Sequence, residues 1–144
     1  MDLKGCDQIC MEPLTAAPFG SPCGCVFPMK VRLLLDIAPY AVFPVMNELE
    51  IEIAEGTYLE QSQVKIMGAN ADSQNQGKTV VEINLVPLGE KFDNTTAVLT
   101  YRRFCDKKVH LNMTLFGDYE VVYISYPGNN FNIFSPLLLT SSSQ

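Results

Sequence analysis

Residues 63–86, QVKIMGANADSQNQGKTVVEINLV, decide the fold that we expect for this chain. Apolar and polar residues alternate over Gln63–Met67 and again over Lys78–Val86, which is typical of strands with one buried face. Between them, Gly68–Gly77 is polar and rich in turn-forming residues. We therefore predict two antiparallel strands joined as a hairpin.

A helix is predicted on each side of this hairpin. Residues 42–55 place apolar side chains at helical spacing, and although LEIEI at 49–53 also alternates like a strand, its Glu and Leu residues favour the helix. Residues 95–105 (TTAVLTYRRFC) predict the second helix, with Asp93 available as its N-cap.

One strand is predicted before the first helix in the sequence and one after the second helix. Val31–Ile37 is an apolar run of strand length, and Tyr119–Tyr126 is dense in aromatic and β-branched residues. The order β-α-β-β-α-β predicts an α+β, ferredoxin-like split sandwich, a four-stranded sheet with both helices on one face. We expect a Cys- and Pro-rich irregular segment over 1–30 packed on the domain, the α+β module over 31–127, and an irregular tail over 128–144.

Composition excludes several classes of protein. The chain has 144 residues, the size of one domain, and a net charge of −6 with its Lys and Arg residues scattered. Nucleic acids and anionic membranes both attract clustered positive charge, so neither is an expected partner. No apolar run approaches the ~20 residues of a membrane span, and residues 1–10 lack the apolar core of a signal peptide. We expect no direct membrane insertion by this chain.

The cysteines indicate an oxidising compartment. Cys6, Cys10, Cys23 and Cys25 lie close together among Pro and Gly residues, a pattern open to two disulfides, a four-thiolate zinc site or free thiols. Bridges within either close pair would strain very small rings, so an early cysteine should meet a late one. A hairpin-like turn through the prolines favours the nested pairs Cys6–Cys25 and Cys10–Cys23. Cys105 is left over and is expected to be a small buried apolar residue.

The chain carries no arrangement of residues that predicts catalysis. Its one histidine, His110, follows Cys105 closely, but no third group is available to orient such a pair. The glutamates between residues 48 and 55 are typical of a solvated helix face, and Gly77-Lys78-Thr79 lacks the upstream glycine of a phosphate loop, since position 72 is Asp72. We predict no catalytic residue, no metal site and no cofactor.

Two sequons point to a secretory origin. Asn94-Thr95-Thr96 and Asn112-Met113-Thr114 both fit the N-glycosylation pattern. Both acceptors lie beside the ends of predicted elements, where a glycan can reach water, so Asn94 and Asn112 are predicted to be glycosylated.

A binding surface needs only an exposed face with a few aromatic anchors. The long hairpin link and the aromatic residues near the last strand are the places that fit this description. The candidate binding residues are Asn70, Asp72, Asn75, Phe116, Tyr119 and Tyr123.

Four segments carry a family resemblance: GSPCGCVFPMKV (20–31), NELEIEIAEGTYLEQSQVKIMGA (47–69), KTVVEINLVPLGEKFDNTTA (78–97) and LFGDYEVVYISYPG (115–128). Through them the chain resembles the extracellular N-terminal domain of plant receptor-like serine/threonine kinases of the abnormal-leaf-shape group. In that family such a domain precedes a proline-rich or spacer region, a membrane span and a cytoplasmic kinase, and this sequence contains none of those parts.

The resemblance implies a non-catalytic ectodomain module on the extracellular side of the plasma membrane. It would bind an extracellular ligand or co-receptor protein on behalf of a signalling, membrane-associated parent whose kinase domain is absent here. The alternative that the cysteines leave open is a small intracellular binding protein with a four-cysteine zinc site.

Overall fold

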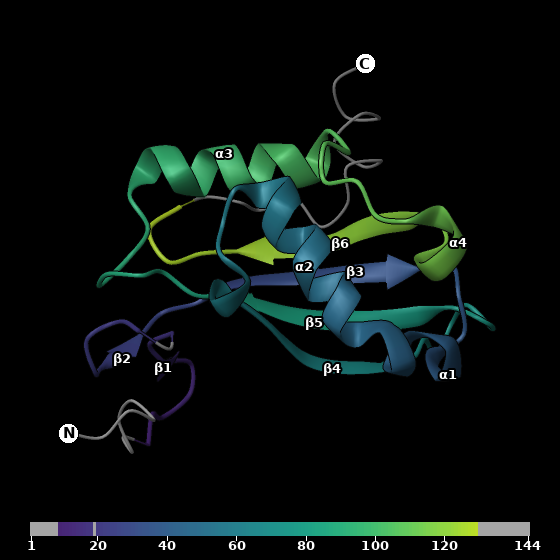
Figure 1. The fold of residues 1–144 in the computed structure, drawn as a ribbon, viewed down its shortest axis with the longest axis horizontal. Helices are drawn as coiled ribbons and strands as arrows, with labels where there is room; N and C mark the ends of the chain where they lie inside the picture. The colour runs from purple at the N-terminus through teal and green to yellow at the C-terminus, as the bar shows by residue number, and fades with distance from the viewer. Residues whose placement is uncertain (1–8, 19, 130–144) are drawn as a thin grey trace.

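The computed structural model describes residues 9–18 and 20–129, which are coloured in Figure 1. They form a two-stranded sheet near the N-terminus and a four-stranded sheet with helices on one side. The elements in chain order are β1 (Thr15–Ala16), β2 (Cys25–Val26), β3 (Met29–Leu35), α1 (Pro39–Val42), η1 (Phe43–Val45), α2 (Met46–Thr57), η2 (Gln61–Gln63), β4 (Val64–Ala71), β5 (Thr79–Leu85), α3 (Asn94–Cys105), α4 (Met113–Phe116) and β6 (Tyr119–Ser125).

The larger sheet has the strand order β4-β5-β3-β6, and every neighbouring pair is antiparallel. Strand β5 lies between β3 and β4, so it separates the two strands that α2 connects. The predicted α+β class is confirmed, as is the succession of strand, helix, strand, strand, helix and strand among the long elements.

One face of this sheet forms the core beneath α2 and α3 (Figure 1). Val31 lies opposite Ile83 in the β3–β5 ladder, and each is 1% exposed. Leu49 from α2 and Phe104 from α3 are fully buried against the same cluster. Burying an aliphatic or aromatic side chain of this size stabilises the fold by about 1.5–3 kcal/mol, so this face is what holds the sheet and helices together.

Both long helices are present, but the first differs from the expected 42–55: α2 begins at Met46, because residues 42–45 belong to α1 and η1, and it continues to Thr57. Helix α2 ends before Tyr58, which takes the left-handed conformation with φ of 62°. Residues 49–53 are helical, because Leu49 and Ile53 lie one helical turn apart and both reach the core. Helix α3 begins after Asp93, whose Oδ1 accepts a hydrogen bond of 2.7 Å from the amide of Thr96, so the predicted N-cap is confirmed.

Two expectations about the elements are wrong, and one short helix was not predicted. Strand β4 continues to Ala71 instead of ending before Gly68, because the backbone keeps pairing with β5 and leaves only residues 72–78 as the link. The N-terminal segment is not wholly irregular, since β1 pairs with β2 and β3 already begins at Met29. Helix α4 was not anticipated, because a helix of a single turn leaves no period in the sequence.

Candidate functional site

The candidate site is the face of the four-stranded sheet opposite α2 and α3, called here the open face. Side chains alternate between the two faces of a strand, so the ladder register determines which residues share the open face. Read across from β4 to β6, the open face consists of the rows Lys65, Asn84, Lys30 and Ser125; Gly68, Glu82, Arg32 and Tyr123; and Asn70, Val80, Leu34 and Glu120.

Arg32 is the centre of the open face. Its Nε donates a hydrogen bond of 2.6 Å to Oε2 of Glu82, and its guanidinium carbon lies 5.5 Å from the ring centroid of Tyr123. Both charged side chains are more than two-fifths exposed, so the ion pair adds at most about 1 kcal/mol to stability. Its main effect is to hold the guanidinium between a carboxylate and an aromatic ring.

Both edge strands carry an extra residue beside this central row. The register of β4 shifts between Ile66 and Gly68, which leaves Met67 without a partner in the ladder. Strand β6 passes from Val121 opposite Leu33 to Tyr123 opposite Arg32, which leaves Val122 unpaired in the same way. Such β-bulges bend a strand and re-aim the side chains beside it, and they are common next to functional sites.

The two bulges border a hollow of about 550 Å³ on the open face. It is lined by Glu12, Lys30, Arg32, Met67, Glu82, Ile83, Asn84, Val122 and Tyr123. The Lys30 ammonium lies 3.8 Å from a carboxylate oxygen of Glu12, in the N-terminal segment. The volume falls within the range that small-molecule sites occupy.

A second hollow of about 370 Å³ adjoins the first. Lys30 and Tyr123 line both hollows, so the two hollows form one groove. This groove runs from the middle of the sheet toward the N-terminal segment. The remaining walls of the second hollow are Pro13, Phe27, Pro28, Ser125, Tyr126 and Pro127.

Asn84 stands at the floor of the first hollow. The residue is only 7% exposed, yet among the described residues none forms a hydrogen bond with its side-chain amide. Every side-chain nitrogen or oxygen that is fully enclosed in the described part of the chain has a hydrogen-bond partner. Because the Asn84 amide has no partner there, it is not fully enclosed and can be reached from the hollow. Buried amides are normally hydrogen-bonded, which makes an unpartnered one in a hollow a candidate ligand contact.

The predicted binding residues divide into three groups. Tyr123 and Asn70 lie on the open face. Asp72 and Asn75 lie in the link after β4, where the Asn75 amide donates to the Asp72 carboxylate, so these two side chains chiefly stabilise the turn.

The prediction that Phe116 and Tyr119 are surface anchors is wrong. Phe116 is fully buried in the core, and Tyr119 is 5% exposed with its hydroxyl donating a hydrogen bond of 2.7 Å to the carbonyl of Val109. Burial raises the pKa of the Tyr119 hydroxyl. Tyr119 and Tyr123 would share a face in a regular strand, and the extra residue Val122 is what sends them to opposite faces.

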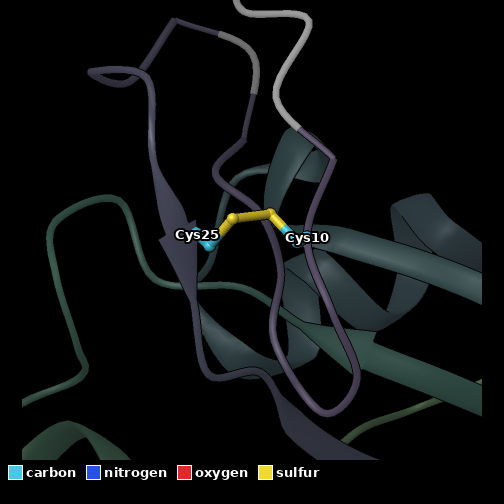
Figure 2. Close-up of a disulfide and its surroundings, with 2 residues drawn as sticks. All are labelled: Cys10 and Cys25. Carbon is cyan, nitrogen blue, oxygen red and sulfur yellow. A yellow bond between two sulfur atoms is a disulfide. The ribbon is translucent and has the colours of Figure 1, made fainter.

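The cysteine pairing differs from the expected nested order. Cys10 is bonded to Cys25, with Cα atoms 5.7 Å apart, and the bond ties the stretch before β1 to strand β2 (Figure 2). The expected Cys6–Cys25 and Cys10–Cys23 pairs are therefore wrong. Cys23 is also disulfide-bonded, and Cys6 lies outside the described residues.

Cys105 has a free thiol that is partly exposed and packs against the core. Burial raises the pKa of this thiol, so less of the reactive thiolate exists at neutral pH. His110 is exposed on the loop after α3, and no contact between it and Cys105 is present among the described residues. This geometry gives no support to a Cys–His catalytic pair.

Both predicted glycan acceptors are exposed on the helical side of the molecule. Asn94 is the first residue of α3, and its Oδ1 accepts a hydrogen bond of 3.0 Å from Asn129. Asn112 is the N-cap of α4, and its Oδ1 accepts hydrogen bonds from the amides of Thr114 and Leu115. A glycan would be attached to the side-chain nitrogen, so the capping oxygen would remain in place.

Over residues 9–18 and 20–129, no three His, Cys, Asp or Glu side chains are grouped so that they would hold a metal ion. Within the same described part, no helix combines the length and apolarity that crossing a bilayer requires.

Comparison with known proteins gives one family and one receptor. Residues 11–130 match the family described as the receptor-like PK ALE2 N-terminal domain. Over 123 residues the chain is 78% identical to the receptor-like serine/threonine-protein kinase ALE2 of Arabidopsis thaliana, an alignment that covers 85% of this chain and 16% of that receptor. No solved structure matches the chain.

Proposed function

The chain belongs to the family of ALE2-type receptor-like kinase N-terminal domains, and from this we propose that it is the extracellular, partner-binding module of such a receptor. The part of the Arabidopsis receptor that it matches is the N-terminal domain and not the kinase domain, so the module is non-catalytic. The module binds an extracellular ligand or co-receptor protein, and other parts of the receptor transmit the signal.

The observation that carries the binding role is the open face. Helices cover the other face of the sheet, while this one is hollowed and lined by charged and aromatic side chains in defined positions. Arg and Tyr are enriched among the residues that dominate binding energy at interfaces, and Arg32 and Tyr123 lie together here.

The placement of the sequons supports the same assignment. Asn94 is the first residue of α3 and Asn112 is the N-cap of α4, so glycans there would extend from the helical side and leave the open face accessible. An extracellular location also fits the Cys10–Cys25 disulfide, because such bonds persist in oxidising compartments. The intracellular zinc alternative needs four thiolates, and the bonded Cys10 and Cys25 cannot supply two of them.

The test of location uses the chain expressed through a plant secretory pathway. Digestion with a glycosidase should lower the mass of the secreted protein, and the loss should be smaller in Asn94→Gln and in Asn112→Asp variants. Secreted material whose mass is unchanged by the enzyme would contradict the surface assignment of both acceptors.

The test of binding compares two tyrosines. Labelled protein should bind saturably to plant cell-surface preparations, and Tyr123→Ala on the open face should weaken that binding. Tyr40→Ala is the matched control, because Tyr40 is 80% exposed on α1, away from the open face. Equal binding by wild type and Tyr123→Ala would refute the assignment of the open face, and catalytic turnover by the purified chain would refute the proposed class of function.

A further inference from the structure

The chemistry of the groove indicates which kind of ligand it would accept. The Asn84 amide, which has no hydrogen-bond partner among the described residues, offers one acceptor and two donor hydrogens at the floor. Around it, the Arg32 guanidinium keeps donors beyond the one used by Glu82, and the carboxylates of Glu82 and Glu12 remain acceptors. A matching ligand must therefore both donate and accept hydrogen bonds at closely spaced points, as neighbouring hydroxyl groups do.

The charges in the groove favour a neutral ligand. Lys30 lies beside Glu12 and Arg32 beside Glu82, so the charges of the groove cancel although the whole chain carries −6. Because these charges cancel, the groove offers neither an anionic nor a cationic ligand a net electrostatic attraction. A neutral ligand leaves both ion pairs intact.

An apolar anchor from a protein partner fits this floor poorly. A hydrophobic side chain placed in the first hollow would cover the Asn84 amide and give it no hydrogen bond, which carries a desolvation cost. The exposed Met67 and the ring of Tyr123 instead provide apolar surface at the sides of the hollow, where the C–H face of a ring-shaped ligand can pack.

The shape of the groove favours a chain over a single small molecule. The second hollow continues past Tyr123 toward Phe27 and Pro28, so a ligand extending from the first hollow would meet a further aromatic surface. Deepening the proposed function, on which this inference rests, we propose that the groove binds a neutral, hydroxyl-rich oligosaccharide, with Asn84 hydrogen-bonded to its hydroxyls and Tyr123 packed against a sugar ring.

The experiment titrates the disulfide-bonded chain with purified hexasaccharides in a calorimeter. Cellohexaose, xylohexaose and mannohexaose are the neutral probes, and hexagalacturonate is the anionic probe. At least one neutral probe should bind saturably, and its affinity should change little with added salt, because no net charge is neutralised.

Asn84→Ala should weaken that binding roughly threefold to tenfold, the range for one or two lost neutral hydrogen bonds. Its melting temperature should match the wild type, because the Asn84 amide holds no partner among the described residues. Asn47→Ala is the matched control: Asn47 is an exposed asparagine on α2, which covers the opposite face of the sheet, so its loss should leave binding unchanged.

Three results would overturn the inference: no binding of any neutral probe, equal affinity of wild type and Asn84→Ala, or a preference for hexagalacturonate that disappears in salt. If the saccharides fail while Tyr123→Ala still weakens cell-surface binding, the carbohydrate inference is wrong and the proposed function stands. If neither assay responds to changes on the open face, the proposed function fails as well.

Discussion

Gly117 offers a sharp test of how the sheet is assembled. It follows α4 with φ of 67° and ψ of −168°, a backbone conformation that side-chain-bearing residues rarely adopt. A Cβ added there would lie 2.5 Å from the backbone carbonyl oxygen of Asp36. Asp36 in turn donates its amide to the carbonyl of Asp118 at 2.9 Å, so the close approach joins the end of β3 to the start of β6.

Two separable costs follow from Gly117→Ala. The strained backbone costs about 1–3 kcal/mol, and the steric overlap with a backbone atom adds about 1–3 kcal/mol because the oxygen cannot rotate away. The expected loss in the free energy of unfolding is therefore roughly 2–6 kcal/mol. For a chain of this size, each 1 kcal/mol lowers the melting temperature by about 3 °C.

Gly77→Ala separates the two costs. Gly77 also has a positive φ, of 81°, but a Cβ there would meet nothing within 4 Å, so only the backbone cost of about 1–2 kcal/mol remains. Urea unfolding followed by circular dichroism, with disulfides intact, measures both variants. The reasoning is refuted if Gly117→Ala loses less than about 1 kcal/mol, a typical single-mutation effect, or no more than Gly77→Ala.

Three further predictions concern the disulfide, a cap and an acidic group. Replacing Cys10 and Cys25 by Ser should lower the free energy of unfolding by about 3 kcal/mol, because the bond closes a loop with a sequence separation of 15, and an unchanged urea midpoint would contradict this. Asn112→Asp should remove the glycan and keep the α4 cap, whereas Asn112→Ala should also cost about 1 kcal/mol in urea unfolding. The backbone hydrogen bond from Thr96 lowers the pKa of Asp93 below its unfolded value, so its stabilising effect is complete above the unfolded pKa and is lost as pH falls through the folded one. As the pH is lowered from neutral to acidic, the melting temperature of Asp93→Asn should therefore fall less steeply than that of the wild type. Identical pH profiles of the two proteins would contradict a stabilising role for the ionised Asp93.

Much of the fold could be predicted because its signals are local. The alternation over β4 and β5, the helical spacing of Leu49 and Ile53, and the cap at Asp93 each act within a few residues. The extension of β4 to Ala71 could not be predicted from its composition, because ladder hydrogen bonds to β5 outweigh the turn-forming character of Gly68 and Asn70.

The candidate site was predicted only in part, because it depends on register. Tyr123 and Asn70 lie on the open face, but the same reasoning also expected Tyr119 at the surface, where it is buried. Asn84 was missed, because the pattern of β5 shows only that it faces away from Ile83 and not that it is only 7% exposed on the opposite face. The cysteine pairing likewise depends on the β1–β2 contact, which no local pattern reveals.

The unpaired Val122 has a consequence for how this strand can change in length. Before it, odd-numbered residues such as Tyr119 and Val121 point to the core, and after it Ile124, an even-numbered residue, does so. Excising Val122 would leave Tyr123 opposite Arg32 and Val121 opposite Leu33, with every neighbour keeping its side. Loss of a residue elsewhere in β6 would exchange core and solvent positions over part of the strand. Among relatives, a gap in the alignment of β6 is therefore expected to fall at this position.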